Sequence, residues 1–164
     1  MEKKIETLIF DWGNTIMVDY NLPGIMKDWD KVSAVSGALL ALERLHSHYN
    51  MVIATSANHS NTEDMIAALK RVGADQYFQH FFSAKDLGVS KPDPNFFRII
   101  TERLGVEPRN TVSIGDRYPN DIDAAKQAGL TTVWLTAEAG EDNHPAANAI
   151  ISSMDLLPLV INSL

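Results

Sequence analysis

The sequence contains no cysteine among its 164 residues. This absence excludes disulfide bonds, thiolate nucleophiles and zinc sites built on cysteine. A chain without cysteine suits a reducing compartment, and we expect a cytoplasmic protein.

Basic residues and long apolar runs are also scarce. The chain has 14 Lys and Arg against 21 Asp and Glu, a net charge of -7, and no basic run. The chain therefore lacks the excess of positive charge that attracts nucleic-acid phosphates, and we expect no generic nucleic-acid binding. The first apolar run, residues 8–10, ends at Asp11 and is too short for a signal segment or a membrane span, so we expect no membrane attachment.

The residues that are present predict one α/β domain over residues 1–164. Hydrophobic residues make up 45% of the chain, enough for one core. Short continuous apolar runs alternate with segments of helical periodicity, and continuous runs are typical of strands buried on both faces of a parallel sheet. The expected strands are residues 5–10, 51–54, 111–114, 132–135 and 149–151.

Helical spacing of apolar residues predicts five helices. They are expected at residues 31–49, 61–73, 93–105, 120–128 and 154–162. Asn61 or Thr62 would cap the second helix and Gly73 would end it, while Pro94 suits the first turn of the third. In the fifth helix Pro158 would cost an interior hydrogen bond. The first helix would run through Val32 and Val35 without a break.

Polar residues follow three of the expected strands. They are Asp11, Thr55 with Ser56, and Asp116. Ligands of open parallel sheets lie outside the carboxyl ends of the strands, so we expect these side chains to converge. Together with Asp121 they would crowd carboxylates into one crevice, which is unfavourable without a cation. Oxygen ligands of this kind predict a Mg²⁺ site.

A lysine and a hydroxyl complete this set. Lys91, in "GVSKPDPNFF", would add a positive charge, and Thr55 or Ser56 a hydrogen-bond donor. Carboxylates, a metal, a lysine and a hydroxyl together suit the binding of a phosphoryl group.

Four motifs in this order resemble the haloacid dehalogenase (HAD) superfamily. They are "LIFDWGNT", "VIATS", "GVSKPDPNFF" and "VSIGDRYPNDIDAAKQAGL", and they span nearly the whole chain. The resemblance implies a three-layer α/β/α Rossmann-like fold and a Mg²⁺-dependent hydrolase. It further implies a phosphatase that acts through an aspartyl phosphate on a phosphorylated small molecule or macromolecule.

The resemblance also implies a role for each matched residue. Asp11 would be the nucleophile. Thr55, or Ser56 if the register differs by one, would bind the phosphoryl oxygens, and Lys91 would stabilise nucleophile and phosphate. Asn58 directly follows this motif and could reach the substrate.

The implied metal ligands are Asp11, Asp116 and Asp121, the last in a "GDxxxxD" pattern, and the backbone carbonyl of Gly13. Asp121 could instead bind the metal through water, or simply favour the first turn of the following helix.

Gly13 departs from the family pattern, which has a second Asp there as general acid and base. A general acid and base of this kind raises the reaction rate about 10²- to 10⁴-fold. Without it, activity should be weakened or specialised for particular substrates. The protein could use substrates with good leaving groups, such as acyl or aryl phosphates. His59, Asp19 or an Asp of a partner subunit could supply the proton. The chain could also bind phosphorylated ligands or proteins with little turnover.

The sequence also leaves no room for a substantial cap domain. Neither the residues between Asp11 and Val32 nor those between Asn58 and Lys91 could form one. Members without a cap act on large substrates or close their sites by oligomerising, so a large or chemically simple substrate and a homo-oligomer are both expected. Residues 18–30 could form a small flap or a contact surface. Dehalogenation ranks below these readings, because that branch has a cap and a tyrosine where this chain has Gly13.

Overall fold

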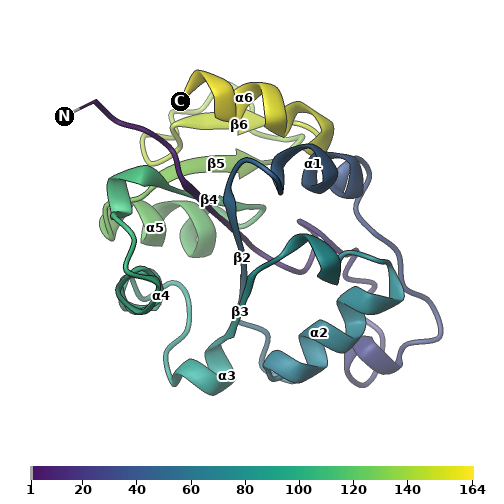
Figure 1. Ribbon diagram of the computed structural model, residues 1–164. Helices are drawn as coiled ribbons and strands as arrows, with labels where there is room; N and C mark the ends of the chain where they lie inside the picture. Colours follow the sequence, from purple (N-terminus) through teal and green to yellow (C-terminus); the bar gives the residue numbers. More distant parts are fainter. Residues whose placement is uncertain (1) are drawn as a thin grey trace.

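The computed structural model describes residues 2–164, which form one six-stranded sheet in which every strand pairs in parallel (Figure 1). The strand order is β3-β2-β1-β4-β5-β6, which confirms the predicted α/β class. The strands are β1 (Thr7–Phe10), β2 (Asn50–Thr55), β3 (His80–Ser83), β4 (Thr111–Gly115), β5 (Thr131–Leu135) and β6 (Ala149–Ile151).

Five of the six strands match the predicted ones, and β3 is the strand that sequence reasoning missed. It forms the edge of the sheet beside β2, with Val52 opposite His80. His80, Phe81 and Phe82 are only half-buried, because an edge strand has a neighbour on one side alone. The segment therefore lacks the continuous apolar run that marks a central parallel strand.

Helices cover both faces of the sheet (Figure 1). One face carries α1 (Ala38–Leu45), α2 (Thr62–Arg71) and α6 (Leu157–Ser163), and the other carries α3 (Ala84–Leu87), α4 (Asn95–Leu104) and α5 (Ala124–Gln127). Shorter turns are η1 (Met26–Asp28), η2 (Asp75–Tyr77), η3 (Pro108–Asn110), η4 (Tyr118–Asp123) and η5 (Met154–Leu156). Of the helices described, none is long and apolar enough to cross a bilayer.

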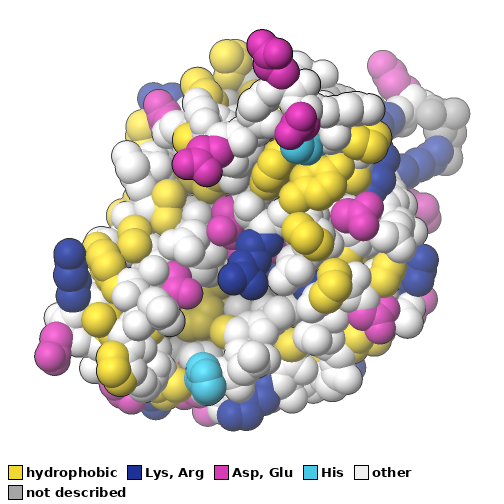
Figure 2. Space-filling model, turned by 180° about the vertical axis from the view of Figure 1, so that it is seen from behind, with side chains coloured by type: hydrophobic (Ala, Val, Ile, Leu, Met, Phe, Trp, Pro, Cys, Tyr) yellow, Lys and Arg dark blue, Asp and Glu magenta, His cyan; other side chains and the backbone are white. Residues whose placement is uncertain are grey.

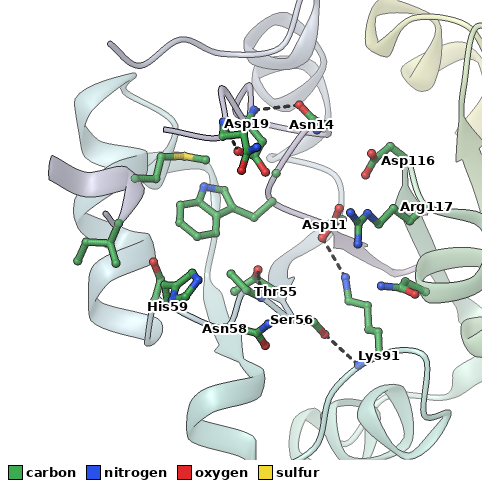
Figure 3. Close-up of a pocket in the computed structure, with 18 of the residues that line it drawn as sticks. Asp11, Asn14, Asp19, Thr55, Ser56, Asn58, His59, Lys91, Asp116 and Arg117 are labelled. Atoms are coloured by element: carbon green, nitrogen blue, oxygen red, sulfur yellow. Dashed lines mark hydrogen bonds and ion pairs between the residues drawn. The ribbon is translucent and has the colours of Figure 1, made fainter. Parts of the chain in front are cut away.

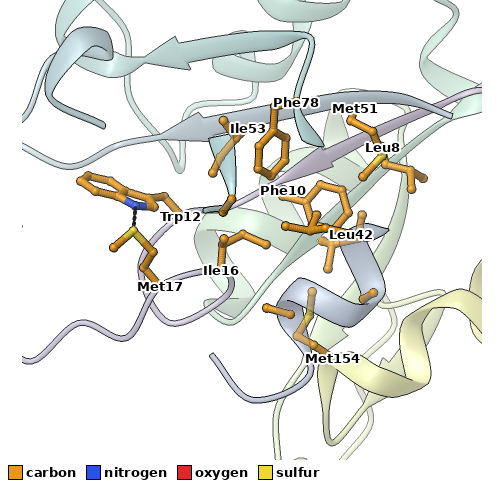
Figure 4. Close-up of a cluster of buried hydrophobic side chains, with 14 of the residues drawn as sticks. Leu8, Phe10, Trp12, Ile16, Met17, Leu42, Met51, Ile53, Phe78 and Met154 are labelled. Carbon is orange, nitrogen blue, oxygen red and sulfur yellow. Dashed lines mark hydrogen bonds between the residues drawn. The ribbon is translucent and has the colours of Figure 1, made fainter. Parts of the chain in front are cut away.

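Successive residues of β1 supply the cores on the two faces. Leu8 and Phe10 belong to the cluster under α1, α2 and α6, and Ile9 belongs to the cluster under α4 and α5. This alternation is the period of two that a strand imposes on its side chains. Figure 4 shows Phe10 near Leu42 and Phe78 in the first cluster. A strand buried on both faces holds the residue that follows it, Asp11, in a fixed place.

The first predicted helix is wrong in its first seven residues. Helix α1 begins only at Ala38, because residues 33–35 pair with residues 16–18 instead: the N–H of Val18 donates to Ser33 O (3.0 Å), and that of Val35 to Ile16 O (2.8 Å). Gly37 then turns the chain at φ 80°, and a Cβ there would lie 2.7 Å from the backbone nitrogen of Asp155. Tertiary pairing thus overrides the helical spacing of Val32 and Val35.

The other predicted helices form with changes at their ends. Asn61 is the N-cap of α2, and its side chain and that of Asp64 cap each other's backbone N–H. The segment predicted at residues 120–128 starts as a π-helical turn at Tyr118 before α5. The expected cost of Pro158 is wrong, since Pro158 lies in the first turn of α6, where its missing N–H has no intrahelical partner to lose.

Candidate active site

A cavity of about 660 Å³ opens at the carboxyl ends of β1, β2 and β4 (Figure 3). This volume lies within the range of small-molecule sites, about 300–1,000 Å³. All the residues predicted for the site line it: Asp11, Gly13, Thr55, Ser56, Asn58, Lys91, Asp116 and Asp121. The side chains that the sequence places far apart therefore share one cavity.

Asp11 follows β1 directly, and its backbone N–H donates to Ile114 O on β4 at 2.9 Å. Its Oδ1 accepts a hydrogen bond from Lys91 Nζ at 3.0 Å. The hydroxyl of Thr15 lies between two carboxylates, 3.5 Å from Asp11 Oδ2 and 3.4 Å from Asp116 Oδ1. One carboxylate oxygen of Asp11 is thus held by a cation, and the other faces a hydroxyl.

Lys91 is the buried cation of the site. Its Nζ lies 3.0 Å from Asp11 Oδ1 and 2.7 Å from Asp121 Oδ1, and the residue is only 7% exposed. Its backbone N–H donates to Ser56 Oγ at 2.9 Å. Burial lowers the pKa of Lys91, but the charges of Asp11 and Asp121 raise it more, so its pKa lies above the ordinary value. The ammonium group is therefore charged at every physiological pH.

Asp121 is buried in the η4 turn, and hydrogen bonds hold both its carboxylate and its backbone carbonyl. The N–H of Arg117 donates to its Oδ2 at 3.0 Å, and Ser113 Oγ donates to its carbonyl at 2.7 Å. Burial raises the pKa of Asp121 most and the charge of Asp11 adds to this, while Lys91 lowers it; the resulting pKa is about 6. A carboxylate in this position needs a nearby positive charge at neutral pH.

Asp116 follows β4, and its backbone carbonyl accepts a hydrogen bond from Trp134 Nε1 at 2.9 Å. Burial raises its pKa most, and the carboxylates of Asp11 and Asp121 raise it further, to about 7. The side chain is therefore on the border of protonation at neutral pH, as expected where like charges meet without a cation.

The three carboxylates fit a divalent metal ion. Asp11, Asp116 and Asp121 each offer one oxygen, and these oxygens lie within 4.8 Å of one another. Lys91 pairs with Asp11 and Asp121, and Asp116 has no ion pair among the described residues, so the cluster favours a further positive charge when ionised. A donor set made only of oxygens suits a hard cation such as Mg²⁺.

Thr55 and Ser56 both remain able to bind a ligand. Thr55 Oγ1 accepts the N–H of Ala57 at 3.0 Å, and Ser56 Oγ accepts the N–H of Lys91 at 2.9 Å. Because each hydroxyl accepts a backbone hydrogen bond, its own proton is left to donate. Asn58 and His59 follow on the same loop and are exposed at the rim of the cavity.

Several residues that support the site have no role in the sequence reasoning. They are Thr15, Ser113, Gly115 and Trp134. The spacing of Thr15, four residues after Asp11, is a signal that could have found it. Trp134 comes from β5, and nothing in its local sequence shows which carbonyl it reaches. Trp12, expected as a packing residue, is buried in the core and donates to Met17 Sδ at 3.2 Å (Figure 4).

Residues 18–30, which we call the flap, form one wall of the cavity. Leu22, Ile25, Met26 and Trp29 of the flap line it. Helix α2 holds the flap: Arg71 donates to the carbonyls of Lys27 and Trp29, and Lys27 Nζ lies 3.2 Å from Asp64 Oδ1. The described residues contain no inserted cap domain, so this short segment is the cover that the site has.

One face of the described residues carries charged side chains of both signs. Figure 2 shows acidic, basic and hydrophobic side chains mixed over the face turned away from the view of Figure 1. On that face of residues 2–164, Lys and Arg side chains are scattered rather than gathered.

A parallel sheet of this order, with Asp11 after β1, Asp116 after β4 and a lysine that joins Asp11 to Asp121, defines the HAD-like class of α/β proteins. A family model described as haloacid dehalogenase-like hydrolase matches residues 9–135, and the chain belongs to this family.

Individual relatives fit this assignment. Glyceraldehyde 3-phosphate phosphatase of Methanopyrus kandleri is 36% identical over 77 residues, 47% of this chain and 33% of the relative. (S)-2-haloacid dehalogenase 4A of Burkholderia cepacia is 30% identical over 139 residues, 83% of this chain and 59% of the relative. The chain thus spans between a third and three fifths of the length of these two curated relatives.

Solved structures share the fold. The putative HAD-hydrolase YfnB of Bacillus subtilis, bound to magnesium, superposes with a TM-score of 0.80 over 98% of this chain and 100% of that one, at 19% identity. At this identity the likeness shows the fold alone.

Proposed function

We propose that the protein is a Mg²⁺-dependent phosphatase that hydrolyses small phosphomonoesters through a phosphoryl group on Asp11. The observation that carries this proposal is the position of the Asp11 carboxylate. It lines an open cavity, its Oδ1 is 3.0 Å from Lys91 Nζ, and its oxygens belong to a cluster of three carboxylates.

In the proposed reaction a carboxylate oxygen of Asp11 attacks the phosphorus atom, and the bond from phosphorus to the leaving oxygen breaks. Water then attacks the phosphorus of the aspartyl phosphate, which releases inorganic phosphate and restores Asp11. Lys91 balances negative charge beside the nucleophile, and the hydroxyl of Thr55 or Ser56 and the amide of Asn58 hold the phosphoryl oxygens. When bound, Mg²⁺ would be held by the three aspartates and the Gly13 carbonyl, and would neutralise phosphoryl charge.

The relatives support the same class of substrate. The names of several of them state phosphatase activity on a small phosphorylated molecule, glyceraldehyde 3-phosphate. A cavity of about 660 Å³ closed on one side by the flap suits a small phosphomonoester better than the large substrate that the missing cap suggests.

Gly13 supports a second candidate, a phosphate-binding protein of the same fold with little turnover. A glycine has no side chain to protonate a leaving group, whereas the residues proposed to bind metal and phosphate all line the cavity. Binding would then survive the loss of turnover.

The test is steady-state phosphate release from p-nitrophenyl phosphate, acetyl phosphate and glyceraldehyde 3-phosphate, with Mg²⁺ and with EDTA. We expect metal-dependent turnover in the wild type and background rates in Asp11→Asn. The matched control is Asp30→Asn, an exposed flap residue outside the cavity. Full activity in folded Asp11→Asn would refute the mechanism. Mg²⁺-dependent phosphate binding without turnover would favour the second candidate.

A further inference from the structure

The chain folds back so that Asp19 stands beside Gly13. A Cβ atom built on Gly13 would have the Cβ of Asp19 as its nearest neighbour, at 3.8 Å. Both residues line the cavity that contains Asp11. The side chain of Asp19 thus begins within 4 Å of the place where a side chain on residue 13 would begin.

Two asparagines hold Asp19 in this place. Asn14 adopts φ 59° and Asn21 φ 53°, the left-handed region that few residues other than glycine enter. Asn14 Oδ1 accepts the N–H of Asp19 at 2.9 Å, and Asp19 Oδ1 accepts the N–H of Asn21 at 2.8 Å (Figure 3). Such backbone positions cost free energy and cluster at functional sites. In this chain they fix the direction in which the Asp19 carboxyl group points.

We propose that Asp19 is the general acid and base of the reaction, in place of a residue at position 13. This inference rests on the proposed phosphatase function. The Asp19 carboxyl group gives its proton to the leaving oxygen as the phosphorus–oxygen bond breaks. The resulting carboxylate then takes a proton from the water that attacks the aspartyl phosphate, so each turnover restores the protonated acid. Its Oδ1 is bound to Asn21, which leaves Oδ2 for this exchange.

His59 also lines the cavity and is another candidate proton donor, but its setting is different. Asp19 and His59 are both exposed, and His59 lies on the loop before α2. Among residues 2–164 no hydrogen bond fixes the His59 ring, whereas Asp19 is held through Asn14 and Asn21. A general acid must be held within hydrogen-bond reach of the leaving oxygen. Asp19 meets the demand for a fixed position, and His59 does not.

The test uses the leaving-group dependence of kcat/KM, which a merely structural role would not change. An alkyl phosphate such as glycerol phosphate needs a proton on its leaving oxygen, whereas p-nitrophenyl phosphate does not. We expect Asp19→Asn to lower kcat/KM for the alkyl ester by about 10²- to 10⁴-fold. For p-nitrophenyl phosphate the loss should be severalfold at most. Asp30→Asn, in the same flap, should match the wild type on both esters.

A second variant tests the position itself. Gly13 has ordinary φ and a Cβ there would meet its nearest neighbour at 3.8 Å, so a side chain can begin at this position without a clash. The double variant Gly13→Asp with Asp19→Asn should regain at least tenfold on the alkyl ester over Asp19→Asn alone.

Other results would overturn the inference. Equal losses on both esters, or a leaving-group-dependent loss in His59→Gln but not in Asp19→Asn, would contradict the role of Asp19 while leaving Asp11-dependent hydrolysis intact. No Asp11-dependent turnover of any ester in the wild type would instead refute the proposed function, and this inference with it.

Discussion

The carboxyl group of Asp121 occupies the space that a Cβ atom on Gly115 would need. Gly115 ends β4 with an ordinary φ, so the glycine is required by close approach and not by backbone conformation. The approach lets Asp121 reach Lys91 Nζ at 2.7 Å, across the last residue of a central strand. The cluster of three carboxylates therefore depends on the absence of a side chain at Gly115.

The first prediction is that Gly115→Ala displaces Asp121. Because Asp121 is buried and short, it has no room to swing aside, and we expect a loss of about 1–3 kcal/mol in the free energy of unfolding, typical of overpacking. Mg²⁺ affinity measured by calorimetry should fall at least tenfold. Gly13→Ala, whose new Cβ meets its nearest atom at 3.8 Å, should keep wild-type stability in urea. Equal stability of the two variants would contradict this account.

The second prediction concerns Lys91→Met. The ammonium of Lys91 lies within 3.0 Å of both Asp11 and Asp121, so its loss leaves buried carboxylates without their cation. Removing one partner of a fully buried ion pair lowers the free energy of unfolding by about 3–5 kcal/mol. We expect Lys91→Met to lose about 3 kcal/mol at pH 7.5. At pH 5, where protonation neutralises Asp121, the difference from wild type should shrink. Lys85→Met, at an exposed position on α3, is the control.

The third prediction is that the metal-free protein loses stability as pH rises from about 4 to 7. In the folded state the pKa is about 7 for Asp116 and about 6 for Asp121, above the ordinary 3.8. The folded protein therefore holds protons that the unfolded chain has released, and stability falls with pH in this window. In EDTA we expect Tm to drop by several degrees from pH 5 to 7.5, since about 1 kcal/mol shifts Tm by about 2–4 °C at this size.

Two comparisons isolate the cause of that drop. Mg²⁺ at pH 7.5 should restore Tm, and Asp116→Asn in EDTA should show a smaller fall than wild type. Asp64 and Asp86 have lowered pKa values, so they affect stability at lower pH, and they do so equally in the wild type and in Asp116→Asn. A Tm of wild type in EDTA that rises steadily to pH 7.5 would contradict the prediction.

The convergence of the site was predictable from the sequence. Asp11 and Asp116 each follow a continuous apolar run, and parallel strands place all such positions at one edge of the sheet. Lys91 and Asp121 could be added through the family motifs. The roles assigned to these residues stay predictions, which the experiments above address.

The contacts that depend on tertiary structure were not predictable. The pairing of residues 33–35 with 16–18 removes Val32 and Val35 from their expected helix, although their spacing is helical. The approach of Asp19 to Gly13 depends on the left-handed φ at Asn14. Hydrophobic periodicity in the sequence does not predict this conformation. Both depend on where the chain turns, and single-residue turns leave only a weak signal in sequence.

The last prediction concerns the flap. The Arg71 side chain donates to the carbonyls of Lys27 and Trp29, and so joins α2 to the wall of the cavity. Hydrogen bonds from a charged group stabilise a folded structure by about 1.5–3 kcal/mol, and by less at an exposed position. Because the loss of these bonds loosens the flap, we expect Arg71→Met to raise KM for phosphate esters about threefold to tenfold. Since the Asp11 cluster is untouched, kcat should change less than twofold. Arg44→Met, exposed on α1, is the control. A fall in kcat at unchanged KM would show that the flap acts on the chemical step instead.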